Sequence, residues 1–543
     1  MTDWKGSNLL MQTLHEQKGI QIADRPVAPT YPWWRLLVLC GLFLFSVLIS
    51  ILLIGAAPRN DFDILPFLHV EIFSFIPYLA ACAFVLLTKP AVGRWRWIEI
   101  GTILLGALIL RVILLPLPPG LSHDSWRYLW DARVTLHGFS PYVYAPFDKA
   151  LIPLRDAVLL PNSRFRTAPT IYPPGAQGVF LLSYLLAGSN LYFLKGIFLV
   201  FDMVTCIALV VLLGRKGLDQ RRVILYAWCP LPIIEFAIEG HVDVITLTFT
   251  ILAVLAATNT SLRGRLLTGF LIGLATLTKI YPILLLVALV PALQTRGDRL
   301  RSFRDGADLS ARRNPLQLSW KHIREIIRYN VPIFIACGMT ILLGYLPYLI
   351  LGHGQALGYF ATYASEQGEN AGVVPQFVSW FSTQYHLFMM SIIPLEHLTD
   401  VLLVCAVSLG VFVLRLYDRI SRESAVLLLF GVVLAISSHV FPWYTTTLLL
   451  WVPVLLGPLW RHKMPVGRTL AMLAVWYFTL ASISGYFFNS IPGHPVPDWS
   501  PYYIFVYWPV MIALVVAALI GIANLYRSRK GRQRANHSTK NEQ

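Results

Sequence analysis

The sequence has few charged residues. Asp, Glu, Lys and Arg make up only 13% of its 543 residues, whereas soluble domains carry about 25%. Hydrophobic residues reach 56%, which excludes a soluble multidomain enzyme and excludes disorder for the bulk of the chain. Because a segment in lipid must satisfy its own backbone hydrogen bonds, long apolar runs become helices. We therefore expect an all-α fold, a polytopic transmembrane helical bundle.

Cysteine and nucleotide-binding motifs are also scarce. The six cysteines lie in apolar runs without metal-like or disulfide-like spacing, so we expect small buried hydrophobes. The sequence has no Walker A loop, no GxGxxG after a strand, no HExxH and no CxxC pair. These absences argue against the use of a cytosolic nucleotide. The sequence therefore identifies no cofactor with certainty. The use of a divalent cation remains an open alternative, and the residues that would bind a metal are unknown.

Hydropathy predicts about fourteen spans, since a span needs roughly 20 apolar residues and fewer inside a bundle. The spans are expected near 34–56, 67–88, 97–117, 190–213, 223–238, 242–258, 266–278, 281–294, 331–351, 398–416, 424–440, 444–460, 468–487 and 502–526. This divides the chain into an N-terminal tail (1–33), a transmembrane domain (34–526) and a basic C-terminal tail (527–543). The N-terminal tail has no signal-peptide h-region, so we expect no cleavage.

The net charge is +16, and many of the basic residues lie in the loops that this topology places on the cytoplasmic side. The loop 295–330 carries nine basic residues, whereas the expected outer loops 352–397 and 488–501 carry no Lys or Arg. Such asymmetry places both termini in the cytoplasm and removes the need for a nucleic-acid partner. The helical spacing of basic and apolar residues at 323–330 is typical of a helix lying on anionic lipid, although a partner site is the alternative.

The expected outer loop 118–174 breaks this charge rule. It holds six cations although it should lie outside: Arg127, Arg133, Lys149, Arg155, Arg164 and Arg166. Long loops translocate regardless of charge, but six cations also indicate that an anion binds there, and phosphate is the obvious candidate. The short apolar segment 175–188 that follows is expected to form a re-entrant or interfacial helix.

The densest polar stretch of this loop is 123–133. If it is helical, Asp124, Arg127, Tyr128 and Asp131 share one face at i, i+3, i+4 and i+7. The face then offers two carboxylates and an arginine to one pocket. Trp126 and Trp130 share another face and are expected to pack at the membrane interface. The alternative is a surface helix held by Asp124–Arg127 and Asp131–Arg127 ion pairs, with the two tryptophans as interfacial anchors.

Ionisable residues cluster at the outer ends of the spans, where they are costly and functional by default. They include Lys195, Glu235, Glu239, His241, Asp243, Lys279 and His439. We expect Arg111 to snorkel outward, Asp202 to pair within the core, and Glu71 and Glu99 to be structural. Aromatic-proline turns lie on the same face, at Tyr172-Pro173-Pro174-Gly175, Tyr281-Pro282 and Pro442-Trp443-Tyr444. They either end helices or form a platform on which sugar rings stack.

An ordered set of motifs along residues 95–460 resembles the GT-C superfamily, the polytopic glycosyltransferases that use polyprenyl-phosphate sugars at the outer membrane face. The nearest pattern is that of bacterial polyprenyl-phosphate-mannose-dependent mannosyltransferases, including glycosyltransferase family 87. The motifs are His123-Asp124-x-x-Arg127-Tyr128-x-Trp130-Asp131, Gly138-x-x-Pro141-Tyr142, Ile171-Tyr172-Pro173-Pro174-Gly175-Ala176-Gln177, Lys195 with Asp202, Gly240-His241-x-Asp243, Lys279-x-Tyr281-Pro282 and His439-x-x-Pro442-Trp443-Tyr444. The Asp-x-Asp or Glu-x-Asp signature of some members is absent, and the two spans at 34–88 are additional.

The resemblance implies an extracytoplasmic active site, in the plasma (inner) membrane, that moves a sugar, mannose by preference, from a polyprenyl-phosphate donor to a lipid or glycan hydroxyl. A carboxylate would act as general base, Asp124 first and Asp131 second. Fixed cations would stabilise the leaving phosphate: Arg127, Arg133, Lys279 and His439. The sugar and acceptor pocket would comprise Tyr128, Tyr172, Gln177, His241, Asp243, Trp443 and Tyr444. Direct displacement would invert the anomeric centre.

Other functions remain open from the sequence. A secondary transporter or lipid flippase would spread charges through the membrane depth, whereas here they favour one face. A GT-C enzyme of another acceptor class would act on lipid A, on protein hydroxyls or in oligosaccharide ligation. A non-catalytic subunit is a further alternative. The sequence leaves the sugar, the acceptor and the oligomeric state open.

Overall fold

The computed structural model describes residues 33–58, 64–291, 320–366, 370–385, 389–457, 465–488 and 500–541. Every regular element within these ranges is a helix, which confirms the expected all-helical fold. Residues 1–32 of the expected N-terminal tail and 292–319 of the expected basic loop lie outside the described residues. The segment expected as the C-terminal tail continues helix α25 as far as Asn541.

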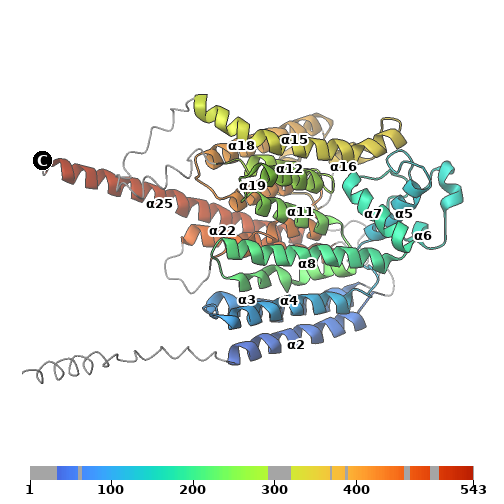
Figure 1. Ribbon diagram of the computed structural model, residues 1–543, viewed down its shortest axis with the longest axis horizontal. Coiled ribbons are helices and arrows are strands. Elements are labelled where there is room, and N and C mark those ends of the chain that lie inside the picture. Colours follow the sequence, from blue (N-terminus) through green and yellow to red (C-terminus); the bar gives the residue numbers. More distant parts are fainter. Residues whose placement is uncertain are drawn as a thin grey trace, which may run out of the picture.

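Eight helical segments among the described residues are long and apolar enough to cross a membrane. Figure 1 shows their helices running side by side along the long axis of the molecule. They belong to α2 (Trp34–Gly55), α3 (Leu65–Leu87), α4 (Arg94–Leu114), α8 (Leu191–Arg215), α15 (Trp320–Leu351), α18 (Met389–Leu416), α22 (Val466–Ala481) with η5 (Ser482–Ser484) and α23 (Gly485–Phe488), and η6 (Tyr503–Tyr507) with α25 (Trp508–Asn541).

The other six expected spans are shorter or broken, so the count of fourteen stays a prediction. Three are single helices of 14 or 15 residues: α11 (Asp243–Ala256), α12 (Leu262–Thr276) and α19 (Arg422–Ile436). Three consist of short helical pieces: η2 (Gln220–Val223), α9 (Ile224–Ala227), α10 (Pro230–Ile233) and η3 (Ile234–Ile238); η4 (Tyr281–Leu284) and α13 (Leu285–Ala288); and α20 (Pro442–Leu449) with α21 (Val452–Leu455). In the first and third, prolines at the starts of α10 and α21 mark the breaks.

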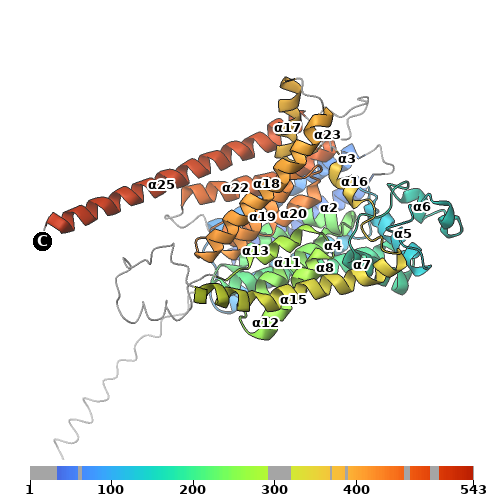
Figure 2. The same ribbon diagram turned by 90° about the horizontal axis from the view of Figure 1, so that it is seen from above.

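Short helices cap one end of the bundle. Helices α5 (Asp124–Leu136), η1 (Lys149–Leu154), α6 (Leu159–Asn162) and α7 (Pro174–Ala187) come from the expected outer loop and the segment after it. Figures 1 and 2 both place α5, α6 and α7 at the end of the bundle opposite the C-terminus. The later connections add α16 (Phe360–Ser365), α17 (Val373–Gln384) and α24 (Ser500–Tyr502).

Helix α7 confirms a helix at 175–188 and ties the outer loop to the bundle. The backbone N–H groups of Gly175 and Ala176 both donate to the carbonyl of Leu277, at 2.7 and 3.1 Å. A Cβ on Gly175 would lie 2.8 Å from that carbonyl oxygen, so only glycine allows the approach. This contact places the start of α7 beside the turn that carries Lys279.

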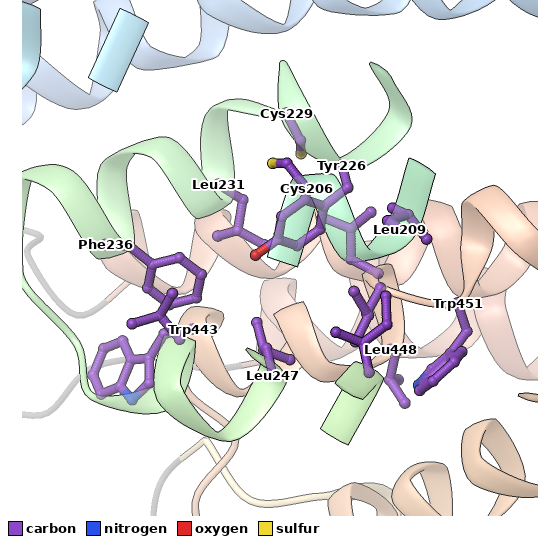
Figure 3. Packing of buried hydrophobic residues seen from close by; sticks show 14 of the residues in the cluster. Cys206, Leu209, Tyr226, Cys229, Leu231, Phe236, Leu247, Trp443, Leu448 and Trp451 are labelled. Carbon is purple, nitrogen blue, oxygen red and sulfur yellow. The ribbon is translucent and has the colours of Figure 1, made fainter. Parts of the chain in front are cut away.

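The apolar core lies between α8, the broken segment 220–238, α11 and α20. Figure 3 shows Tyr226, Cys206 and Cys229 within it, and Trp443 and Trp451 toward opposite ends of the group. Burial of Cys82, Cys206, Cys229 and Cys337 confirms their expected role as small hydrophobes. The expectation was wrong for Cys405, which is exposed, and only partly right for Cys40, because each lies on the outer side of a peripheral helix.

Buried ion pairs tie the helices of the bundle to one another. The expectation that Arg111 snorkels was wrong: it is 1% exposed, and its Nε lies 2.6 Å from Asp202, which does pair within the core. Glu99 is structural as expected, since its carboxylate lies 2.8 Å from Arg35 and 3.3 Å from Arg221. Placing charged partners together offsets the cost of burying each one alone.

Candidate active site

A cavity of about 380 Å³ lies at the end of the bundle capped by α5, a size typical of small-molecule sites. Its walls come from the outer loop, from the turns before α11 and η4, and from the segments around α16 and α20. Nine of the thirteen predicted site residues line it: Asp124, Arg127, Tyr128, Tyr172, Asp243, Lys279, His439, Trp443 and Tyr444. Asp131, Arg133, Gln177 and His241 lie outside the lining.

Asp124 opens α5 and faces the cavity with a 20% exposed side chain. Its Oδ2 accepts a hydrogen bond of 3.0 Å from the Tyr172 hydroxyl. Burial raises the pKa of the Asp124 carboxyl above its ordinary value, while that hydrogen bond and the charge of Lys279 oppose the rise. A partly desolvated carboxylate with one hydrogen-bond donor is suited to accept a proton.

Aromatic packing fixes the residues around Asp124. Tyr128 stacks on Phe180 of α7 with centroids 4.3 Å apart, and meets Tyr172 edge to face at 4.8 Å. The hydroxyl of Tyr142 donates to the backbone carbonyl of Tyr172 at 2.7 Å. Tyr172 therefore forms part of the cavity wall, and the prolines that follow it begin α7 at Pro174.

The carboxylate of Glu239 anchors the chain just before α5. It accepts the backbone N–H groups of Gly120, Leu121 and Ser122 at 3.2, 3.0 and 2.9 Å. These contacts connect the segment after η3 to the residues that precede Asp124. Sequence spacing does not reveal this role, because Glu239 lies 117 positions from Ser122.

Lys279 brings a cation to the same cavity. Its Nζ lies 3.3 Å from Asp243 Oδ1 and 4.5 Å from the ring centroid of Tyr444. The charge is thus held by one carboxylate and one aromatic face, and 18% of the side chain remains exposed. A preorganised ammonium of this kind can bind an anionic group that enters the cavity.

A series of parallel aromatic rings forms another wall. Ring centroids of His439 and Phe441 lie 5.7 Å apart, and those of Phe441 and Trp443 lie 4.5 Å apart. Tyr363 stacks on His439 at 5.1 Å, and its hydroxyl lies 2.9 Å from that of Tyr444. Aromatic faces with polar edges suit recognition of a sugar ring, whose C–H and O–H groups meet both kinds of surface.

The remaining charges of α5 are occupied within the protein. Arg127 Nε lies 2.7 Å from Asp131 Oδ1, while its Nη atoms donate to the carbonyls of Phe165 and Ala168 at 2.8 and 2.9 Å. Gln177 Nε2 donates to the other oxygen of Asp131 at 3.2 Å. The alternative of a helix held by an Arg127–Asp131 ion pair is therefore present in part.

Two further residues of this helix, Arg133 and Trp130, lie elsewhere than expected. Arg133 contacts Asp156 at 2.7 Å, the Tyr184 hydroxyl and Ser189, away from the cavity lining. Its role as a phosphate ligand, and the roles of Arg127 and Asp131, stay predictions. Trp130 was expected at the membrane interface, but it is fully buried because α5 packs against α7 and α6 rather than lying on a free surface.

Several cavity residues escaped sequence reasoning because no spacing links them to the motifs. The connection between α15 and α17 contributes three of them to the cavity: Tyr363, Glu366 and Asn370. Glu366 Oε2 lies 3.8 Å from His439 Nε2. Arg164 also lines the cavity with an exposed side chain. The excess of cations in the outer loop was a signal for Arg164, whereas nothing in the sequence singled out Tyr363.

No group of three or more His, Cys, Asp or Glu side chains is arranged to hold a metal ion in the part of the chain that the structure describes. Asp243 is already paired with Lys279. His439 and Glu366 approach each other in the cavity wall, but two side chains alone do not complete a coordination shell. The dependence on a divalent cation therefore stays a prediction, and no step below is routed through one.

The apolar helices and the cavity at one end of the bundle define an integral membrane protein with a candidate small-molecule site. Residues 47–295, a little under half of the chain, match the family model of the alpha-(1->6)-mannopyranosyltransferase N-terminal domain, the MptA_B family. The match supports a mannose-transferring glycosyltransferase and covers Asp124, Asp243 and Lys279. A search of curated proteins finds no match.

Proposed function

We propose that this protein transfers mannose from a polyprenyl-phosphate-linked donor to a hydroxyl of a lipid or glycan acceptor, at the extracytoplasmic face of the plasma membrane. The observation that carries the proposal is the meeting of Asp124, Lys279 and an aromatic wall in one cavity at the capped end of the bundle. A carboxylate, a cation and stacking surfaces are what base-assisted transfer from a sugar phosphate requires.

In the proposed reaction, the acceptor oxygen attacks the anomeric carbon of mannose while Asp124 takes the hydroxyl proton. The bond from the anomeric carbon to the phosphate oxygen breaks, and its electron pair leaves with the lipid phosphate. The base works only when ionised, and the Tyr172 hydrogen bond helps to keep it so. A single displacement inverts the anomeric centre, so a β-linked donor would give an α-linked product.

Lys279 would stabilise the charge that develops on the leaving phosphate. Its ammonium already lies in the cavity, held by Asp243 and Tyr444, so little reorganisation is needed when the charge forms. Arg164 lines the same cavity and would add to the positive field. His439 also lines it, but burial lowers the pKa of its imidazole, so it would contribute a hydrogen bond rather than a charge. The name of the matched family also suggests the linkage: we propose that the acceptor is a 6-hydroxyl and that the product is α-(1→6)-linked.

The test is transfer of radiolabelled mannose by the purified, detergent-solubilised protein. Synthetic polyprenyl-phosphate mannose is compared with GDP-mannose and with polyprenyl-phosphate glucose, each with and without EDTA. We expect label in an extracted lipid or glycan only from the polyprenyl-phosphate mannose donor, with an α-(1→6) linkage on product analysis. Transfer from GDP-mannose alone would contradict the proposed donor, and transfer of glucose alone would contradict the proposed sugar.

A matched pair of variants tests the base. Asp124→Asn should reduce transfer by about a thousandfold, the size typical of a lost general base. Asp148→Asn makes the same change in the same loop, at an Asp whose side chain caps η1 by accepting the N–H of Ala150. Full activity of Asp124→Asn would overturn the assignment of the base.

A further inference from the structure

His241 lies directly behind Asp124 and outside the cavity lining. Its side chain is fully buried, and its Nδ1 lies 4.0 Å from Asp124 Oδ2. The other ring nitrogen, Nε2, lies 3.3 Å from Glu235 Oε2. Neither nitrogen makes a hydrogen bond of good geometry among the described residues. A buried imidazole that points one nitrogen at each of two carboxyl groups needs an explanation.

The local backbone holds the ring in this place. Residues 234–238 form one turn of π-helix, and Gly240 then adopts a left-handed conformation with φ of +71°. The positive φ favours glycine at this position, and a Cβ there would also crowd the side chains of Lys195 at 3.1 Å and Ser125 at 3.3 Å. The backbone N–H of His241 donates to the carbonyl of Glu235 at 2.9 Å, which fixes the two residues relative to each other.

Stacking fixes the plane of the His241 ring. Its centroid lies 3.8 Å from that of Trp443, with an angle of 13° between the planes. Trp443 is itself the last member of the aromatic series that begins at His439. The imidazole therefore cannot tilt without disturbing the cavity wall. Within this plane its two nitrogens point toward Asp124 and Glu235.

Glu235, on the other side of the imidazole from Asp124, is also held in place. The Tyr486 hydroxyl donates to Glu235 at 3.0 Å, and both side chains are buried. Glu235 is fully buried with the charge of Glu239 nearby. An isolated ionised carboxylate is costly in such surroundings, so a carboxyl group there tends to keep its proton. A protonated Glu235 would donate to Nε2 and leave the single N–H of a neutral imidazole on Nδ1.

We infer that His241 is a positioning residue for Asp124, with its Nδ1–H directed at the base by Glu235. The inference rests on the proposed function, in which Asp124 takes the acceptor proton. The separation of 4.0 Å is longer than a hydrogen bond. Such contacts shorten when substrate fills a site. The N–H would then orient the carboxylate and favour its ionised form, while Asp124 itself still receives the proton.

Other charges also face this pair and must be kept constant in a test. Lys279, Asp243 and Arg164 act on Asp124 through their charges, and the Tyr172 hydroxyl contacts it directly. Lys279 also faces His241. Substitutions within the pair of His241 and Glu235 leave these other charges in place.

The experiment measures kcat, KM and the pH dependence of kcat for mannose transfer. His241→Gln keeps an amide near the position of Nε2 but none near Nδ1, whereas His241→Asn keeps one near Nδ1. We expect kcat of His241→Gln to fall about tenfold to a hundredfold, as for one lost hydrogen bond to a charged group. The acidic limb should move up by about one pH unit, with KM little changed. His241→Asn should recover part of both losses.

Variants of Glu235 provide an independent test of the positioning role. Glu235→Gln can still donate to Nε2 and should keep the wild-type pH profile, whereas Glu235→Leu cannot and should shift it as His241→Gln does. Glu423→Leu removes another buried carboxylate, one that pairs with Lys216 outside the cavity, and should leave the profile unchanged in the folded fraction. Combining Glu235→Leu with His241→Gln should add little.

The outcomes separate this inference from the proposed function. An inactive Asp124→Asn beside a His241→Gln variant with the wild-type kcat and pH profile would overturn the positioning role alone. A fully active Asp124→Asn would overturn the base assignment and the inference together. If His241→Gln and His241→Asn lost activity equally with unshifted acidic limbs, the residue would be only structural, and the inference would be wrong.

Discussion

Two sets of buried ionisable groups occupy this bundle, and they differ in how completely their charges are paired. In the middle of the bundle, Arg111 and Asp202 lie 2.6 Å apart, and Tyr226 donates to the second oxygen of Asp202 at 2.7 Å. At the capped end, Asp124 accepts a hydrogen bond of 3.0 Å from Tyr172, and Lys279 shares its charge with Asp243 at 3.3 Å.

The difference separates structural from chemical roles among residues of the same type. A charge pair with short contacts that lies outside the lining of the described cavity lowers the cost of its own burial and can do little else. A carboxylate and an ammonium that keep open sides toward one cavity can accept a proton and bind an anion. Both sets are costly in a membrane protein, so cost alone does not identify function.

The largest expected effect concerns the paired set. Asp202→Asn leaves the buried charge of Arg111 without its carboxylate partner, so we expect about 3–5 kcal/mol of lost stability. Thermal unfolding of the detergent-solubilised variant measures this loss, with Asp148→Asn as the control. An unchanged unfolding midpoint would show that the pair contributes nothing and would remove half of the comparison.

Lys279→Met should act mainly on catalysis, and transfer is compared at equal amounts of folded protein because the variant also leaves the carboxylate of Asp243 without its partner. The variant keeps the length of the side chain but removes the charge that would meet the leaving phosphate, so kcat should fall about a hundredfold to a thousandfold. Lys216→Met removes a cation paired with Glu423 elsewhere in the bundle. Equal losses in the two variants would contradict a specific role for Lys279 in transfer.

Tyr172→Phe should produce a smaller, pH-dependent effect. Burial already raises the pKa of Asp124, and the Tyr172 hydrogen bond opposes that rise. Without it the pKa should rise further, so the base is protonated over a wider acidic range. We expect the acidic limb of kcat to move to higher pH by about one unit, with activity kept at high pH. Tyr144→Phe, outside the cavity lining, is the control, and a limb that moves to lower pH would contradict the account.

Sequence patterns predicted the helical class and much of the cavity, for identifiable reasons. Asp124 and Tyr128 lie on one helical face, and the turns at Tyr172, Lys279 and Trp443 each lie beside a run of apolar residues. Turns at the same end of the spans meet in space, so their residues were expected together. Proline placement likewise explains why expected spans such as 223–238 are broken.

Partner choice within the bundle lay beyond the sequence. Arg127 pairs with Asp131 at i+4, as helical spacing allows, but Arg111 meets Asp202 across 91 positions, where no local rule applies. The stacking of His241 on Trp443 joins distant segments of the chain in the same way. Such contacts depend on how helices pack, which periodicity does not specify.

The most direct test compares Asp124→Asn with Asp202→Asn in one mannose-transfer assay. The two substitutions are chemically identical, and both are made at carboxyl groups inside the same helical bundle. At equal amounts of folded protein, we expect Asp124→Asn to lose transfer and Asp202→Asn to retain it despite lower stability. Loss of transfer in Asp202→Asn with full transfer in Asp124→Asn would show that the reaction does not take place in the cavity at the capped end.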